Sequence, residues 1–123
     1  MPLLGLIAAG EPIEALETPN SVTVPSSLVR PDNFVLQVKG QSMIDEQIQD
    51  GDYIVVKKTA TARSGQIVVA IINDEATLKC YVPKSDRIEL HPRNPKFPII
   101  TIKKTDKFYI NGVLLYSFRE YAS

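Results

Sequence analysis

Short apolar runs, each the length of a β-strand, recur along most of the chain. Turn-forming residues separate these runs, because nine prolines and six glycines divide a chain of only 123 residues. From Phe34 onward the pattern predicts strands over residues 34–39, 53–58, 66–72, 77–82, 87–91, 97–102, 107–110 and 113–118. One short helix is predicted, over residues 42–47. The sequence therefore predicts an all-β domain with at most a short helical turn.

The last two predicted strands flank Asn111-Gly112, a pair that favours the positive φ angles of a two-residue hairpin turn. We therefore expect residues 113–118 to be the return strand of a hairpin. Residues 113–116 are apolar at every position, which leaves two interpretations. Both faces are buried within one subunit, or the strands pair with a second copy. We expect a homodimer through the C-terminal strands.

The first thirty residues are apolar without a clear period, and four prolines interrupt them. We expect residues 1–30 to form an extended arm and residues 31–123 to form the folded domain. The arm lacks the basic start and the long apolar run of a signal peptide. No apolar run approaches the roughly 18 residues of a membrane span. A cytoplasmic protein is the expectation.

The composition excludes several classes of binding and catalytic site. Lys and Arg together number 14, as do Asp and Glu, so the basic excess typical of DNA-binding domains is missing. We interpret the locally basic stretch over residues 84–107 as solvated surface. Cys80 and His91 are the only residues of their types, which excludes an intrachain disulfide and metal sites that need several Cys or His ligands. No metal or cofactor is expected.

A serine nucleophile remains possible if a lysine acts as its base, because burial can keep a lysine neutral. Ser42 follows Gly40-Gln41 at the start of the predicted helix, beside free backbone N–H groups. Serine is also a common helix N-cap. Lys79 lies in a predicted strand with Thr77 on the same face, placed to hydrogen-bond its amine. An exposed edge-strand lysine is the alternative. On the local patterns alone, the helix cap and the exposed lysine are the favoured interpretations.

Several motifs in order resemble the LexA/UmuD family of self-cleaving proteins. Residues 40–45 and 48–52 are similar to the family's G-x-S-M and I-x-D-G-D patterns. Residues 65–79 resemble the strand pair that leads to the family's lysine, and residues 93–99 resemble the N-x-x-F/Y-x-P-I segment that follows. Residues 2–12 resemble the cleavage region, in the Ala-Ala-Gly-Glu-Pro form of the repressor branch. The resemblance covers the chain from Pro2 to about Phe118.

The resemblance implies a fold shared with signal peptidases, built from several short, strongly twisted antiparallel sheets. It also implies that Ser42 attacks the Ala9–Gly10 bond of its own chain while neutral Lys79 acts as the base. The supporting residues that it implies are Thr77, which orients Lys79, the backbone N–H groups of Gln41 and Ser42 as an oxyanion hole, and Met43. Cys80 stands where many relatives carry a basic residue, and we expect it to be inert.

The resemblance further implies a transcriptional repressor of the DNA-damage (SOS) response. Its partners would be itself, as a homodimer, and a RecA–single-stranded DNA filament that stimulates cleavage. Operator DNA would be bound only through an N-terminal domain that is absent from this chain. Three alternatives stay open: a UmuD-like translesion polymerase accessory protein, a phage-type repressor, and a catalytically inactive dimerisation module. A signal peptidase that acts on other chains is disfavoured, because no membrane anchor is present.

Overall fold

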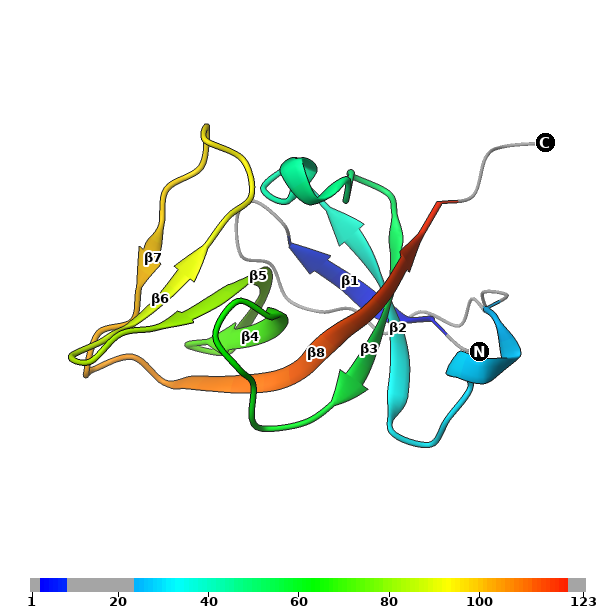
Figure 1. The fold of residues 1–123 in the computed structure, drawn as a ribbon, viewed down its shortest axis with the longest axis horizontal. Helices are drawn as coiled ribbons and strands as arrows, with labels where there is room; N and C mark the ends of the chain where they lie inside the picture. The colour runs from blue at the N-terminus through cyan, green and yellow to red at the C-terminus, as the bar shows by residue number, and fades with distance from the viewer. Residues whose placement is uncertain (1–2, 9–23, 120–123) are drawn as a thin grey trace.

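The computed structural model describes residues 3–8 and 24–119, and their strands form one eight-stranded sheet in the order β1-β2-β3-β8-β4-β5-β6-β7 (Figure 1). The strands are β1 Leu3–Ala8, β2 Asn33–Lys39, β3 Tyr53–Lys58, β4 Ile67–Ile72, β5 Glu75–Pro83, β6 Ile88–His91, β7 Ile100–Thr101 and β8 Phe108–Phe118. Two single 3-10 turns, η1 Ser26–Leu28 and η2 Ile44–Glu46, are the only helical elements among the described residues. The all-β prediction is confirmed, although the strands form one continuous sheet instead of several.

The sheet closes on itself through its first strand. β1 runs parallel to β2, and at Ala8 it also pairs with Thr77 of β5. All other pairings are antiparallel. Six strands therefore form a ring, and β6 and β7 continue from β5 as an extension on one side (Figure 1). This closure brings the N-terminal strand beside β5, the strand that carries Lys79.

The main core lies among β2, β3, β4, β5 and the loop before η2. It consists of Leu36, Val38, Met43, Ile48, Ile54, Val56, Val69, Ala76 and Leu78. Burying a large aliphatic side chain contributes about 1.5–3 kcal/mol, so this cluster fixes the strands that carry the candidate site. No described helix is long and apolar enough to cross a membrane.

The predicted hairpin at Asn111-Gly112 is wrong, because β8 continues through both residues from Phe108 to Phe118. Neither residue has a positive φ. The β8 register instead shifts twice, between Val69 and Ala70 of β4 and between Val55 and Val56 of β3. A Cβ at Gly112 would collide with Val56 Cγ1 and lie 2.7 Å from the Lys57 carbonyl oxygen. Glycine is needed there for close approach to β3, and not for a turn.

Two further predictions were too long. The strand expected over residues 97–102 is reduced to Ile100–Thr101, since Pro95 and Pro98 interrupt the segment before it. The helix expected over residues 42–47 is the single turn η2. Its last residue is followed by Gln47 in the left-handed conformation, with φ 62°, which ends the turn.

Candidate active site

Lys79 lies in the middle of β5, where both faces of the strand are buried. Ala76 and Leu78 belong to the main core, so Thr77 and Lys79 point to the opposite side of the strand. Lys79 is only 1% exposed. The alternative of an exposed edge-strand lysine is therefore wrong.

The Lys79 amine contacts two hydroxyl groups. Its Nζ is 3.1 Å from Ser42 Oγ and 2.7 Å from Thr77 Oγ1. Burial lowers the pKa of Lys79 from 10.5 to about 8, because desolvation penalises the charged amine. At pH 7 roughly a tenth of this lysine is therefore neutral, and the neutral fraction reaches about half near pH 8. A neutral amine at this distance can accept the proton of a serine hydroxyl.

Ser42 lies in the loop between β2 and η2 and is fully buried. The chain turns at Gly40, whose φ of 104° is in the region that favours glycine. The N-cap of η2 is Met43, and no side chain caps this turn. Ser42 is therefore not a helix cap, and its hydroxyl is directed at Lys79. Met43 is also fully buried, in the main core, and anchors the loop directly after the serine.

Residues 93 and 94 form hydrogen bonds to the backbone of the loop that carries Ser42. The Arg93 N–H donates to the Ser42 carbonyl at 2.6 Å, and the Asn94 amide donates to the Gln41 carbonyl at 2.8 Å. The Asp45 N–H returns a bond to the Arg93 carbonyl at 2.7 Å. We call residues 93–94 the clamp segment. The sequence analysis gave these residues no role, although they lie in a motif that it singled out.

The backbone N–H groups of the predicted oxyanion hole lie in the loop that the clamp segment binds. Within the described chain, no acceptor takes a hydrogen bond from the backbone N–H groups of Gln41, Ser42 or Met43. These N–H groups are thus available to a developing negative charge. Gln41 itself is exposed, whereas the serine that follows is buried.

A second polar contact supports the loop from its other end. Arg119 binds buried Asp52 with two bonds, of 2.6 Å and 3.0 Å, and the Gln49 N–H donates to the same carboxylate. Burial raises the pKa of Asp52, but the bonds from Arg119 and Gln49 outweigh it and hold the pKa below its usual value. The pair connects the end of β8 to the turn that follows the Ser42 loop. Sequence reasoning did not identify it, since the partners are 67 residues apart.

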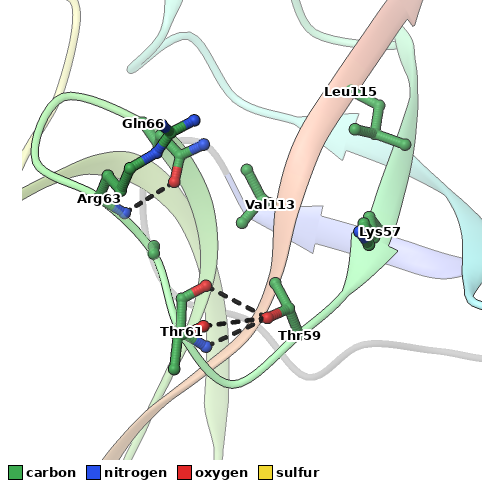
Figure 2. A pocket seen from close by; sticks show the side chains of 8 residues that line it. Lys57, Thr59, Thr61, Arg63, Gln66, Val113 and Leu115 are labelled. Atoms are coloured by element: carbon green, nitrogen blue, oxygen red, sulfur yellow. Dashed lines mark hydrogen bonds between the residues drawn. The ribbon is translucent and has the colours of Figure 1, made fainter.

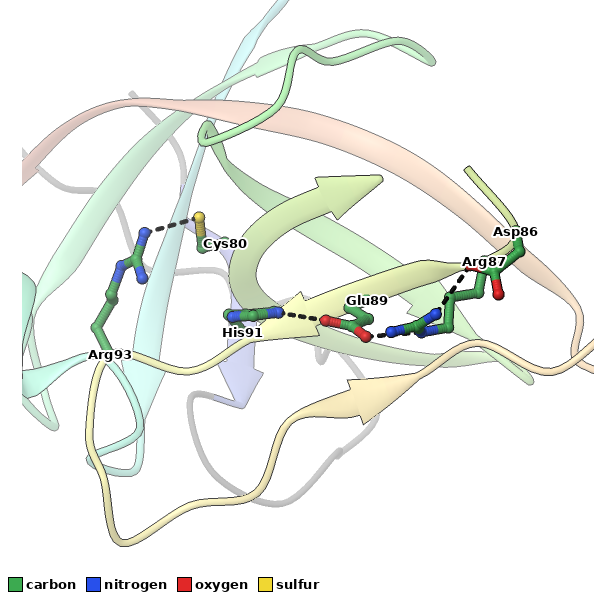
Figure 3. A network of polar contacts seen from close by, with 6 residues as sticks. All are labelled: Cys80, Asp86, Arg87, Glu89, His91 and Arg93. Atoms are coloured by element: carbon green, nitrogen blue, oxygen red, sulfur yellow. Dashed lines mark hydrogen bonds and ion pairs between the residues drawn. The ribbon is translucent and has the colours of Figure 1, made fainter. Parts of the chain in front are cut away.

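Cys80 and His91 each make polar contacts in which neither Ser42 Oγ nor Lys79 Nζ takes part (Figure 3). Arg93 Nη2 is 3.0 Å from Cys80 Sγ, and His91 and Arg87 both bind Glu89. Burial raises the pKa of the Cys80 thiol, which keeps it protonated and unreactive at neutral pH. No three potential metal ligands cluster in the part of the chain that the structure describes.

Surface hollows lie away from the Ser42–Lys79 contact. One of about 460 Å³ is lined by the β3–β4 connection and by Val113 and Leu115 of β8 (Figure 2). Another, of about 440 Å³, lies along the clamp segment next to Phe97 and Ile99. Neither includes Ser42 or Lys79, since both side chains are buried. The described segment that leads into the site is β1, whose Ala8 pairs with Thr77. Ala9 and Gly10, the predicted scissile pair, lie outside the described residues.

Known proteins match this chain over most or all of its length. The Peptidase S24-like family matches residues 2–115. The LexA repressor of Syntrophotalea carbinolica is 49% identical over 124 residues, which cover 100% of this chain and 61% of that protein. The LexA repressor of Syntrophobacter fumaroxidans is 43% identical over 98% of this chain and 59% of that protein. That of Myxococcus xanthus is 49% identical over 86% and 50%, respectively. The chain thus spans between half and about three fifths of the length of these relatives.

Proposed function

Because the chain belongs to the Peptidase S24-like family, we propose that it is the self-cleaving and dimerising domain of a LexA-type repressor. The observation that carries the proposal is the contact between Lys79 Nζ and Ser42 Oγ, 3.1 Å apart. The lysine is buried and its pKa is lowered to about 8. This contact and the lowered pKa support a role for Lys79 as the base, because only the neutral amine can take the serine proton.

The proposed reaction is acyl transfer on the chain's own backbone. Neutral Lys79 takes the Ser42 hydroxyl proton as Ser42 Oγ attacks the Ala9 carbonyl carbon. The N–H groups of Gln41 and Ser42 stabilise the oxyanion, Met43 anchors the loop that carries them, and Thr77 holds the lysine amine in line. As the bond breaks, Lys79 gives the proton to the Gly10 amine, and Ala9 stays as an ester on Ser42. Lys79 then takes a proton from water as the water oxygen attacks the Ala9 ester carbon. The bond to Ser42 Oγ breaks, Lys79 returns the proton to that oxygen, and Ala9 leaves as a carboxylic acid that ionises.

The substrate is proposed from the position of β1. Ala8 pairs with Thr77, two residues from Lys79, and the Ala9–Gly10 bond follows directly in the sequence. Small side chains at Ala9 and Gly10 suit close passage of a backbone through a narrow site. A buried serine and lysine also suit a substrate supplied by the same chain, because no described hollow reaches them.

The biological setting is proposed from the relatives, which bear the name LexA repressor. A RecA–single-stranded DNA filament would bind the cleavable state preferentially and raise its population. Cleavage would separate an N-terminal DNA-binding domain from this dimerising domain. The repressor would then lose operator affinity, because bivalent binding is lost. On this proposal the protein acts in the cytoplasm and controls DNA-damage (SOS) and DNA-repair genes.

Intact mass measurement tests the proposal. The purified chain is incubated at about pH 7 and about pH 10, the latter near the reference lysine pKa. We expect loss of residues 1–9, faster at the higher pH, and no loss in Ser42→Ala or Lys79→Ala. An unchanged mass at both pH values and with an activated RecA filament would leave a dimerisation module without catalysis.

A further inference from the structure

The clamp segment fixes the orientation of the peptide group between Gln41 and Ser42. Two donors reach the Gln41 carbonyl. The side-chain amide of Asn94 lies at 2.8 Å, across 53 residues of sequence, and the Ile44 N–H of the same loop is farther away, at 3.3 Å. The structure contains no cis peptide bonds among its described residues. In a trans peptide group the C=O and N–H bonds point in opposite directions. An amide that holds the Gln41 carbonyl toward Asn94 therefore holds the Ser42 N–H away from Asn94.

The peptide group between Ser42 and Met43 is oriented in the same way, with its carbonyl toward the clamp segment. The Arg93 N–H donates to the Ser42 carbonyl at 2.6 Å, so the Met43 N–H is also directed away from the clamp segment. Two successive carbonyls are thus bound by two adjacent residues of one segment. The two N–H groups opposite them remain without a described acceptor. Successive N–H groups on one side of the chain form a concave anion-binding arrangement.

Asn94 is itself held in place. Its Oδ1 accepts the Lys96 N–H at 3.0 Å, which leaves Nδ2 to face the Gln41 carbonyl. The side chain is half-buried, and the neighbouring Arg93 is anchored by Glu46 and Cys80. The amide donor is therefore pre-organised on a segment that contacts the nucleophile loop at several points.

We propose that Asn94 is a positioning residue for self-cleavage, because its amide fixes the peptide group whose N–H stabilises the oxyanion. This inference rests on the proposed function. Asn94 touches neither the scissile bond nor Lys79 in this account. Its loss therefore weakens stabilisation of the transition state without changing the titration of the base.

Two substitutions separate this role from general support of the fold. Asn94→Asp keeps the shape and the acceptor for the Lys96 N–H but replaces the donor with an acceptor. Asn94→Ala removes the donor without adding a charge. Glu46→Gln is the matched control, because it removes the ion pair between the clamp segment and the same loop but leaves both carbonyl contacts intact.

The rate of self-cleavage is the first readout. We expect both Asn94 variants to cleave roughly 10- to 100-fold more slowly, somewhat less than the effect of deleting an oxyanion donor outright. In Asn94→Ala the pH at which the rate levels off should stay at about 8, since Lys79 keeps its environment. Glu46→Gln should cleave within about twofold of the wild type. Wild-type rates in both Asn94 variants, or a displaced pH midpoint in Asn94→Ala, would overturn the proposal.

The second readout does not depend on activity. Residual dipolar couplings of backbone amides report the direction of each N–H bond and can be measured at about pH 6, where Lys79 is charged. We expect the Ser42 coupling to change in both Asn94 variants and to stay constant in Glu46→Gln. An unchanged Ser42 coupling would refute the positioning role. If the wild type never cleaves, the proposed function fails, and the dipolar couplings still decide whether Asn94 orients the Ser42 N–H.

Discussion

A single buried amine sets the chemistry of this domain at the scale of the residue. Lys79 is almost fully buried, and no carboxylate pairs with it in the described part of the chain. Its hydrogen-bonding partners are the hydroxyls of Ser42 and Thr77, which stabilise a charge only weakly. Desolvation therefore dominates, and the lowered pKa follows from burial. Burial of this amine beside the serine therefore lowers the stability of the fold at neutral pH.

This cost predicts how stability depends on pH. Lys79 titrates at 10.5 when unfolded and at about 8 when folded. Between these values the unfolded state binds more protons, so the free energy of unfolding rises with pH. The rise from this residue is up to roughly 3 kcal/mol, at about 1.4 kcal/mol per pKa unit. Below pH 8 both states are protonated, and the cost of burying the charge is fully present.

Urea unfolding of Ser42→Ala, with and without Lys79→Met, measures this effect in chains that do not cleave. At about pH 7 the double variant should be more stable by roughly 1–3 kcal/mol, because an apolar side chain replaces a buried charge. The difference should shrink as the pH approaches 10. A double variant that is less stable at pH 7 would show that the charged amine is well accommodated in the fold.

The site residues differ in how well a sequence can predict them. Ser42 and Lys79 are 37 positions apart, and their local patterns favour a helix cap and a surface lysine. Only motifs in the right order singled them out. Asn94 and Arg119 act through contacts across 53 and 67 positions, which no local pattern encodes. The roles of such residues can be identified only from the fold, which brings distant segments into contact.

At the scale of the element, β8 joins the two halves of the ring. It pairs with β3 along one edge and with β4 along the other, and each pairing contains a register shift. These irregularities let one strand of 11 residues serve both neighbours. Gly112 lies where the backbone of β3 comes closest to β8.

Gly112→Ala tests this close approach against the hairpin interpretation. The added methyl would meet Val56 Cγ1 and the Lys57 backbone, so we expect a loss of about 1–3 kcal/mol in the free energy of unfolding. Asn111→Ala is the control on the same strand and should cost less than about 0.5 kcal/mol. In a two-residue turn both positions would need a positive φ, and the two substitutions would cost similar amounts.

Apolar periodicity predicted most strands well, because the runs at β2 to β6 are bounded by turn residues. It failed at Asn111-Gly112, where a strong local turn signal is overridden by pairing with two neighbouring strands. It also gave no strand for residues 3–8, whose place in the sheet depends on partners more than 25 positions away. Tertiary pairing therefore decided the elements that local patterns missed.

At the scale of the whole molecule, the C-terminal half of β8 is the expected dimer contact. Its pairing with β4 stops at Val113, and residues beyond it pair only with β3 among the described strands. Leu115 and Tyr116 are each 45% exposed there. An open strand edge beside exposed apolar side chains favours pairing with a second copy.

Sedimentation velocity tests this contact with charge substitutions. We expect the wild type to be a dimer and Tyr116→Asp to be a monomer at the same concentration, because a buried unpaired carboxylate is costly at an interface. Tyr109→Asp is the control, near the opposite end of the same strand, where the tyrosine is 55% exposed. A wild-type monomer, or equal weakening by both substitutions, would place the dimer contact elsewhere.

The pH dependence of self-cleavage tests the central claim most directly, that a buried neutral lysine activates Ser42. The first-order rate is measured from about pH 6 to about pH 11, with Lys79→Ala as the inactive control. We expect a rate that rises about tenfold per pH unit and levels off near pH 8, at the pKa that burial gives Lys79. A rate that keeps rising to the ordinary lysine pKa of 10.5, or persists without Lys79, would contradict it.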